Sequence, residues 1–594
     1  MKKDKSDKLS KIRHSSAHIL AQAVMNLYKG VKLAIGPAID NGFYYDFEFP
    51  KAVKISKNDL PAIKNEMIRI IKEKQEFVRS DKSIDEAISF LKERNQPYSR
   101  ELAEDLKKQG HESVSFYKNG NFINLCSGPH VKSSDDIRAV KLLSVAGAYW
   151  KGDEKNKMLV RIYGTAFESE KELVMHLENL KKAKQNDHRK LGKQLDLFCF
   201  SDLVGPGLPL YTPKGSVIIE ELQKHIEKVC RKYGFEKVIT PHIAKINLYK
   251  LSGHAEKYPE EILHVSSERY KDWAMKPVQC PHQAQIYASR PRSYKELPIR
   301  YMESNKQYRG EKPGELRGLE RVIAITVEDG HSFCRVDQVK EEVKIIVRII
   351  KEFFEALGLW QSKWVSLSVR DYENLDKYIG DSKEWDICEK LLQEVSDEMK
   401  LDARVCEGEA AVYGPKLDFM FKDALGRDVQ IPTVQVDFAS PGRFQLSYID
   451  EKGKEVPPVM VHRAILGSYE RLLVVLLEHF GGALPLWLSP VQVVVLPVSE
   501  KQSEYARDLC NNLKTQEIRV ELNDKSNPLS ARIREAQMQK IPYIVVVGDK
   551  EAKNKSISVR MRDGKQVPEM QFEKFVEDIK KEIEDKALKT NYNL

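Results

Sequence analysis

The sequence predicts an α+β protein built from several domains. Its 594 residues, at about 150 residues for each domain, suggest about four domains. Hydrophobic residues make up 41% of the chain and charged residues 31%, which provides for packed cores and soluble surfaces. Strand-like and helix-like patterns follow a different order in different regions, and no fixed repeat period links them. These observations exclude a single small binding module and a largely disordered chain.

Charge and composition limit the possible partners and the compartment. Lys and Arg outnumber Asp and Glu by 97 to 88, a net charge of +9, which permits a nucleic-acid partner without requiring one. The longest aliphatic run, Leu472 to Leu477, is far short of the ~20 residues that cross a bilayer. The N-terminus lacks the apolar segment of a secretory signal, and the eight cysteines are scattered. We therefore expect a cytoplasmic protein with reduced thiols and no membrane partner.

The N-terminal region has the pattern of an α+β unit. We expect the lysine-rich segment 1–11 to be frayed and a helix to begin near Ile12, where apolar residues start to recur at helical spacing. Residues 33–49 are aromatic and rich in turn formers, which favours strands, whereas residues 59–110 favour helices. Residues 114–165 return to strands and turns, so helices and strands are both present but do not alternate regularly.

The segment that follows is strongly charged. Residues 168–193 predict one long helix, and the simplest interpretation is a solvated connector. Its basic end, from Lys181 to Lys193, could also contact a phosphate backbone.

The remainder of the chain divides into a large region and a smaller one. The large region, 196–485, opens with a segment rich in Gly and Pro, continues with an amphipathic helix over 215–233, and ends with a helix from about Gly467 to His479. The last region, 488–585, alternates in the order βαβαββα. That order predicts an open α/β sheet covered by helices.

Two pairs of histidine and cysteine residues lie in the N-terminal region. His14 and His18 are four residues apart, so on a helix they share one face. Cys126 and His130 flank a Gly-Pro pair that forces a turn. Four such groups could bind zinc or line a polar pocket without metal, and a histidine pair alone is often an ordinary surface feature. The sequence leaves these alternatives open.

A second set of potential ligands is spread over the large region. Its members are Cys280, His331, Cys334 and His462, and no local CxxC or HExxH spacing connects them. Because a free cysteine is often simply buried, this distributed set is a weak signal when taken alone.

Arginines in the large region suggest an anion site. Arg309 precedes a Gly/Pro loop that leads to Arg321, and Arg471 follows Gly467 by four residues, so we expect Gly467 to leave space beside it. Two arginines from separate elements could clamp a triphosphate, although surface ion pairing is the alternative. The sequence contains no GxxxxGK[ST] motif and no GxGxxG before a helix, so phosphate recognition of the P-loop or Rossmann type is excluded.

Several separated motifs, in this order, resemble those of the threonyl-tRNA synthetases, a family of class II aminoacyl-tRNA synthetases, over about residues 12–585. HSSAHILAQAV, CSGPH and YWKGDEKNKMLVRIYGTAF are similar to the editing domain of the family. YRGE resembles class II motif 2, and Pro241 in VITPHI resembles the motif 1 proline at the dimer interface. YGPKLDF, QIPTVQVDF and VHRAILGSYER resemble the amino-acid pocket and motif 3.

The resemblance implies a fold for each region. It implies an α+β editing domain over 1–167, with a second editing subdomain over 114–165, a linker helix over 168–195, a class II catalytic domain with an antiparallel sheet over 196–486, and an α/β anticodon-binding domain over 487–594. The N-terminal ubiquitin-like module of many relatives is expected to be absent, because HSSAH begins at residue 14.

The resemblance also assigns residues to roles. It implies Cys280, His331 and His462 as zinc ligands, with Cys334 as a spectator. The other residues that it implies are Arg309, Glu311, Arg471 and Lys416 for catalysis and ATP, Asp329, Tyr413, Gln430, Gln435, Thr433 and Ser468 around threonine, His14, His18, Cys126 and His130 for editing, and Glu551 and Arg560 for the anticodon.

The implied activity is ATP-dependent attachment of L-threonine to tRNA(Thr) through a threonyl-adenylate. One zinc ion per subunit, Mg²⁺ with ATP, and a homodimer are also implied. Threonine and valine are nearly isosteric, so an apolar pocket separates them only ~100-fold. A zinc ion with three protein ligands keeps a position open for the substrate amine and hydroxyl, which valine cannot fill. Serine still enters, so a second site that hydrolyses seryl-tRNA(Thr) is expected.

Four departures from the family pattern affect the expected activity. Ile325 replaces the aromatic residue expected against adenine, Ile323 replaces an arginine, and Val327 replaces a glutamine. CPGH appears as CPHQ, with His282 and Gln283. Each lost contact is expected to cost ~1–3 kcal/mol of ATP or threonine binding. The alternative function is therefore a catalytically weakened paralogue that binds or deacylates tRNA.

Overall fold

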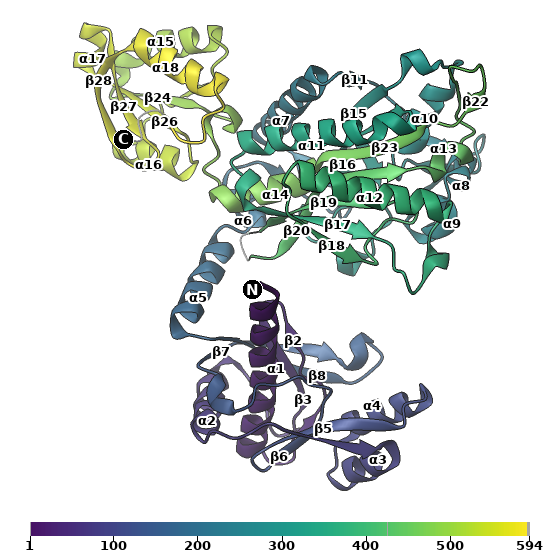
Figure 1. The fold of residues 1–594 in the computed structure, drawn as a ribbon. Helices are drawn as coiled ribbons and strands as arrows, with labels where there is room; N and C mark the ends of the chain where they lie inside the picture. The colour runs from purple at the N-terminus through teal and green to yellow at the C-terminus, as the bar shows by residue number, and fades with distance from the viewer. Residues whose placement is uncertain (1, 424–425, 591–594) are drawn as a thin grey trace. The chain divides into compact units, whose positions relative to one another are not determined.

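The chain forms two compact units, residues 1–181 and 182–594. The computed structural model describes residues 2–423 and 426–590, and Figure 1 labels their helices and strands. The predicted fold class is confirmed, because helices combine with sheets that are mostly antiparallel.

A five-stranded sheet packed against helix α1 forms the centre of the N-terminal unit. The strand order is β1-β3-β8-β7, with β2 paired to β3. Apolar residues of α1 such as Ile19 and Leu20 pack against Phe43 and Phe47 of the sheet. The elements are α1 (Lys2–Leu27), β1 (Lys32–Leu33), β2 (Ala38–Ile39), β3 (Gly42–Glu48), α2 (Leu60–Lys72), β7 (Ala139–Tyr149) and β8 (Met158–Phe167).

A smaller three-stranded sheet with two helices completes this unit. Its order is β4-β5-β6, all antiparallel. A small apolar core that includes Ile84, Leu91 and Phe116 joins the sheet to its helices. The elements are β4 (Val78–Ser83), α3 (Ile84–Glu93), α4 (Pro97–Lys108), β5 (Ser113–Asn119) and β6 (Phe122–Leu125).

Two local predictions for this unit are wrong. Helix α1 begins at Lys2 rather than near Ile12, because the lysine-rich segment contains neither Pro nor Gly to stop a helix. Strand β4 lies inside the region expected to be helical, because Val78–Ser83 pairs along its whole length with β5.

The charged connector is two helices rather than one. Helices α5 (Glu170–Gln185) and α6 (His188–Gln194) are separated at Asn186 and Asp187. The Asp187 carboxylate accepts a hydrogen bond from the backbone N–H of Arg189 at 2.9 Å, so Asp187 starts a new helix as an N-cap. The prediction of one continuous helix over 168–193 is therefore wrong, because charge pattern alone does not reveal the cap.

An eight-stranded sheet forms the main body of the second unit. Its order is β11-β15-β16-β23-β20-β19-β17-β18, with parallel pairs only at its two ends. The strands are β11 (Glu236–Lys237), β15 (Ile299–Tyr308), β16 (Ala324–Cys334), β17 (Lys363–Val369), β18 (Ala403–Glu407), β19 (Lys416–Lys422), β20 (Asp428–Asp437) and β23 (Val459–Ser468).

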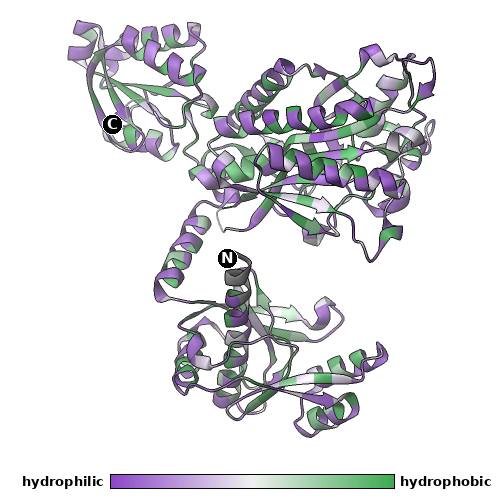
Figure 2. Cartoon of the chain, viewed as in Figure 1, coloured by the Kyte–Doolittle hydropathy of each residue, from purple (hydrophilic) through white to green (hydrophobic). Residues whose placement is uncertain are grey.

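Four long helices pack with this sheet into one large core. They are α7 (Pro213–Lys232), α11 (Val339–Ala356), α12 (Ser382–Glu398) and α14 (Tyr469–Phe480). In Figure 2, α11 carries hydrophobic and hydrophilic residues along its whole length, because one face, including Ile346 and Phe353, is buried. The predicted helices over 215–233 and 467–479 correspond to α7 and α14.

Short helices and strands complete this region of the second unit. Helix α10 matters most for the site, because it begins at Cys280. These elements are β9 (Phe198–Cys199), β10 (Leu210–Tyr211), β12 (Ile243–Lys245), α8 (Ile246–Leu251), α9 (His254–Lys257), β13 (His264–Val265), β14 (Trp273–Met275), α10 (Cys280–Ala288), α13 (Ala439–Arg443), β21 (Tyr448–Ile449) and β22 (Glu455–Val456).

The C-terminal region has the predicted open sheet. The order is β25-β24-β26-β27-β28, with the first three strands parallel. Helix α17 and strand β28 were not predicted, because a six-residue helix is too short to give a periodic signal and the sequence of β28, QVPEMQ, has no apolar run. The elements are β24 (Val493–Pro497), α15 (Ser503–Thr515), β25 (Val520–Leu522), α16 (Leu529–Met538), β26 (Tyr543–Val547), α17 (Asp549–Asn554), β27 (Ser556–Met561), β28 (Gln566–Gln571) and α18 (Phe572–Glu584).

Candidate functional site

Three residues far apart in sequence meet at the eight-stranded sheet. His331 of β16 lies directly opposite His462 of β23, and Cys280 begins α10. One nitrogen or sulfur atom from each lies within 4.8 Å of the others. The three sequence-predicted ligands therefore converge, whereas Cys334 is buried in the large apolar core and is not part of the group.

The outer nitrogens of both histidines are already hydrogen-bonded. His331 Nδ1 lies 2.7 Å from Gln283 Oε1, and His462 Nε2 lies 2.9 Å from Asp437 Oδ2. Both partners are acceptors, so each histidine keeps its proton on the outer nitrogen and directs a lone pair inward. The inner nitrogens, His331 Nε2 and His462 Nδ1, are 3.0 Å apart.

This donor set fits a zinc ion. One thiol and two imidazoles, each imidazole held by an acceptor behind it, are typical of zinc sites. Two nitrogens at about 2.0–2.1 Å from a tetrahedral zinc lie about 3.3 Å apart, close to the 3.0 Å found here. Burial lowers the pKa of His331 well below its ordinary value, which favours the neutral form that binds metal.

Three arginines gather beside the start of α14. Burial and then the positive charges of Arg309 and Arg321 lower the pKa of Arg471. Arg321 is paired with two carboxylates, Glu311 at 2.6 Å and Glu315 at 3.0 Å. Like charges brought together in this way favour an anionic ligand that neutralises them.

Arg471 is positioned by the cap of its helix. The Ser468 hydroxyl accepts a hydrogen bond from the backbone N–H of Arg471 at 3.2 Å, which makes Ser468 the N-cap. Gly467 has a φ of +64°, and a Cβ there would lie 2.9 Å from the carbonyl oxygen of Ile431. The expectation that Gly467 leaves space for Arg471 is therefore wrong, because the glycine allows close approach to β20.

A polar network on β19 and β20 connects three predicted residues through one that the sequence reasoning missed. Asp418 is 3% exposed and pairs with Lys416 at 2.8 Å. The same carboxylate accepts hydrogen bonds from Gln430 at 2.6 Å and from Thr433 at 2.7 Å. Because alternate strand residues share a face, the spacing of Lys416 and Asp418 could have revealed this network. Gln435 lies on β20 directly opposite both Lys416 and His462.

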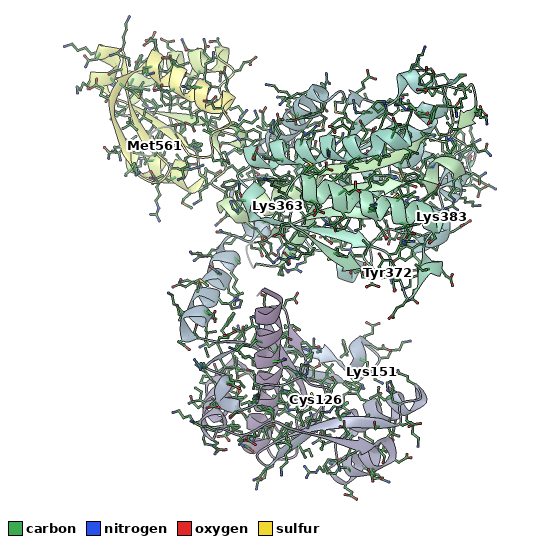
Figure 3. All side chains as sticks on the ribbon, in the orientation of Figure 1. Cys126, Lys151, Lys363, Tyr372, Lys383 and Met561 are labelled. Carbon is green, nitrogen blue, oxygen red and sulfur yellow. The ribbon has the colours of Figure 1, made fainter. Side chains whose placement is uncertain are left out.

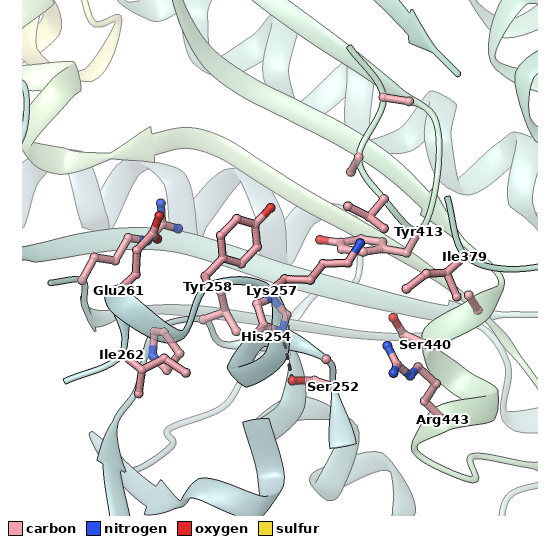
Figure 4. Close-up of a pocket in the computed structure, with 18 residues that line it drawn as sticks. Ser252, His254, Lys257, Tyr258, Glu261, Ile262, Ile379, Tyr413, Ser440 and Arg443 are labelled. Carbon is pink, nitrogen blue, oxygen red and sulfur yellow. Dashed lines mark hydrogen bonds between the residues drawn. The ribbon is translucent and has the colours of Figure 1, made fainter. Parts of the chain in front are cut away.

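A cavity of about 410 Å³ adjoins these groups. It is lined by Arg309 and Tyr413, which were predicted, and by His254 and Arg443, which were not. Figure 4 shows Tyr413, His254 and Arg443 around this space. The Tyr413 ring centroid lies 5.4 Å from that of His462, so Tyr413 lies beside both the cavity and the cysteine–histidine group. Burial is the main cause that lowers the pKa of His254 to about 4.

The replaced residues of the family pattern lie beside this site. On β16, Ile325 and Val327 share a face with Asp329 and His331 by strand alternation. Burial raises the pKa of Asp329 to about 6. Apolar side chains therefore stand where the family pattern has an aromatic ring and an amide, on the same strand face as Asp329 and His331.

The four editing candidates of the N-terminal unit form one cluster. One nitrogen or sulfur atom from each of His14, His18, Cys126 and His130 lies within 4.8 Å of the others. Cys126, labelled in Figure 3, has its Sγ 3.3 Å from His14 Nε2 and 3.2 Å from His130 Nε2. His18 is 2% exposed, so the alternative of ordinary surface histidines is excluded.

Protonation in this cluster is governed by burial. Burial lowers the pKa of His18 to about 3 and lowers the pKa of His14 as well. It raises the pKa of Cys126 to about 11. At neutral pH the cluster therefore holds neutral imidazoles, which accept protons, and a protonated thiol.

The two anticodon candidates lie in the C-terminal sheet region. Glu551 of α17 accepts hydrogen bonds from the Gly548 N–H at 2.9 Å and the Ser558 hydroxyl at 2.7 Å. Arg560 lies on the neighbouring strand β27. The Glu551 contacts stabilise the start of a short helix, so its carboxylate already has a structural role.

The fold and these sites define a class II aminoacyl-tRNA synthetase. The family described as tRNA synthetase class II core domain (G, H, P, S and T) matches residues 263–480. The anticodon binding domain matches residues 492–582, and the threonyl and alanyl tRNA synthetase second additional domain matches residues 114–163.

Relatives over nearly the full length define the specificity. A threonine–tRNA ligase of Cytophaga hutchinsonii is 43% identical over 572 residues, which cover 96% of this chain and 88% of the relative. One of Caldanaerobacter subterraneus is 45% identical over 575 residues, 97% and 87% of the two chains. A crystal structure of the RNA binding domain of threonyl-tRNA synthetase from Cryptosporidium parvum has a TM-score of 0.63 at 34% identity and covers 68% of this chain and 99% of that one.

The chain belongs to the threonyl-tRNA synthetases. It is a threonine–tRNA ligase that uses ATP with Mg²⁺, an amino acid and tRNA, and it carries the editing domain of the family. None of the described helices combines the length and the apolar composition that a membrane crossing requires.

Proposed function

We propose that the eight-stranded sheet carries threonine activation, with each predicted residue in a separate task. Arg309 and Arg471 bind the phosphates of ATP together with Mg²⁺, and they stabilise the charge that develops as the threonine carboxylate attacks the α-phosphorus and pyrophosphate leaves. Glu311 holds the neighbouring Arg321 through their 2.6 Å ion pair. Lys416, anchored by Asp418, adds positive charge beside this site.

Threonine selection rests on the cysteine–histidine group. Cys280, His331 and His462 would hold a zinc ion, which supplies an open coordination position for the amine and hydroxyl of threonine. Asp329 and Tyr413 orient the bound amino acid, and Gln430, Gln435, Thr433 and Ser468 complete the polar surroundings. Convergence of three ligands from distant segments within 4.8 Å is the single observation that carries this proposal.

The cluster of the N-terminal unit is the hydrolytic site for seryl-tRNA(Thr). His14 Nδ1 lies 3.3 Å from the Pro129 carbonyl oxygen, which keeps the proton on Nδ1 and makes Nε2, 3.3 Å from the Cys126 Sγ, a proton acceptor. Ser15 accepts from the Val131 N–H at 3.0 Å and contacts His130 Nδ1 at 3.1 Å, so the turn that carries His130 is fixed to α1. These groups orient a water molecule and accept its proton.

Glu551 and Arg560 would contact bases of the tRNA(Thr) anticodon.

Two copies of the chain would pair near Pro241. Apolar side chains next to Pro241 are unusually accessible, since Ile239 is 84% exposed and Ile243 is 39% exposed. Exposed apolar residues grouped beside a motif 1 proline favour burial against a second copy.

Threonine-dependent exchange of pyrophosphate with ATP tests the proposal. The purified full chain with zinc is expected to exchange with threonine and with serine, but not with valine, because valine has no hydroxyl. Exchange at background level with zinc supplied would favour the weakened paralogue that binds or deacylates tRNA.

A further inference from the structure

Helix α10 supplies more than one residue to the cysteine–histidine group. Gln283 follows Cys280 by three residues on this helix, so both side chains lie on the same face. Gln283 has no exposed surface, and its Oε1 lies 2.7 Å from His331 Nδ1. One helical turn therefore carries a predicted ligand and the partner of another.

The contact between Gln283 Oε1 and His331 Nδ1 decides that the lone pair of His331 is on Nε2, the nitrogen that faces His462. An imidazole that donates from Nδ1 has its lone pair on Nε2. Asp437 imposes the complementary arrangement on His462, whose free lone pair is on Nδ1. The two nitrogens that carry these lone pairs are 3.0 Å apart. A cation bound by both nitrogens would remove the repulsion between the lone pairs.

The burial of Gln283 is unfavourable unless its carbonyl oxygen has a use. Within the described part of the chain, the Gln283 Nε2 group is buried without a hydrogen-bond partner. An apolar side chain of similar length would avoid the free-energy cost of burying an amide N–H group without a hydrogen bond. Among residues 2–423 and 426–590, the contact to His331 is the one hydrogen bond of this side-chain amide, so it accounts for a glutamine at this position.

We propose that Gln283 is a positioning residue for zinc, and that its carbonyl oxygen holds His331 with Nε2 as the metal-binding nitrogen. This inference rests on the zinc site of the proposed function. It also gives a role to a position at which the chain departs from the CPGH pattern. The property that matters is acceptance of the Nδ1 proton, so a carboxylate would serve and a thioether would not.

Metal binding by three variants of the full chain tests this role. Gln283→Met removes the acceptor at similar length, and Gln283→Glu keeps it. Gln492→Met is the matched control, because Gln492 is 1% exposed and accepts from the Arg519 N–H at 2.9 Å, in the C-terminal region. Zinc affinity is measured by competition with a chromophoric chelator, and the ligand set is followed through the visible absorption of Co²⁺ in place of zinc.

Gln283→Met is expected to weaken zinc about 10- to 100-fold and to alter the Co²⁺ spectrum. Gln283→Glu and Gln492→Met are expected to stay within a few-fold of the parent chain. If Gln283→Met does not fold, Gln283→Asn withdraws the same carbonyl by one methylene and is expected to weaken zinc in the same way.

The positioning role would be overturned, and the zinc site left intact, by an unchanged zinc affinity and an unchanged Co²⁺ spectrum in Gln283→Met. The same result in Gln283→Asn would count equally if Gln283→Met does not fold. A parent chain that binds no zinc, or a Cys280→Ser variant that retains it, would instead overturn the zinc site and the inference with it.

Discussion

Replacement of Arg471 by alanine is expected to weaken ATP binding while leaving the stability of the fold unchanged. Within the residues that the structure describes, the Arg471 guanidinium makes a single hydrogen bond, from Nε to the Glu320 carbonyl oxygen at 3.1 Å. Burial and the charges of Arg309 and Arg321 lower its pKa, so the fold disfavours the protonated form that is present at neutral pH. The variant should therefore keep its stability.

The expected effect of Arg471→Ala is a loss of catalytic efficiency with ATP. A hydrogen bond to a charged group contributes about 1.5–3 kcal/mol, and each 1.36 kcal/mol is about tenfold. Arg471→Ala should therefore lower kcat/KM for ATP by about 10- to 150-fold in pyrophosphate exchange. The KM for threonine should change by less than about threefold.

A matched variant controls for the loss of one positive charge. Arg348 on α11 is paired with Glu341 at the surface, at 2.8 Å, and Arg348→Ala should leave both KM values unchanged. The reasoning is refuted if Arg471→Ala lowers the melting temperature by several degrees, or if the KM for threonine rises as much as that for ATP.

Three further outcomes are expected. Cys280→Ser should lose stoichiometric zinc and threonine activation together, and metal analysis that finds one zinc per chain in this variant contradicts the ligand assignment. The double variant His14→Ala, His18→Ala should charge threonine normally but accumulate seryl-tRNA(Thr), and unchanged deacylation of that product would contradict the editing assignment. Ile325→Phe should lower the KM for ATP about 2- to 10-fold through one aromatic stacking contact of about 0.5–1.5 kcal/mol, whereas an unchanged KM would mean that this side chain does not face adenine.

Periodicity and turn residues predicted four of the five strands of the C-terminal sheet and missed β28. The four predicted strands are short apolar runs between turn and charged residues, so local pattern indicates them, whereas β28 lacks such a run and pairs with β27. The break at Asp187 was not predictable in the same way, because a single capping side chain interrupts a segment whose charge pattern is continuous. The same limit applies to β4, whose Val78–Ser83 is exposed along most of its length and is a strand only because β5 lies beside it.

The sequence by itself, through its resemblance to the family, indicated which residues to expect at the reaction site. The order of its motifs named Cys280, His331 and His462 as one set and the two arginines Arg309 and Arg471 as another. The types of these residues indicate the ligand of each set, because thiol and imidazole favour zinc and guanidinium favours phosphate.

Only the tertiary structure decided how those residues are held. Asp418, Gln283 and Asp437 carry no motif of their own, and each acts through a contact to a residue that is distant in the sequence or on another turn. The physical reason is that strand pairing fixes which side chains face each other. His331 meets His462 because β16 and β23 are neighbours in one register, and no local pattern along the chain encodes that register.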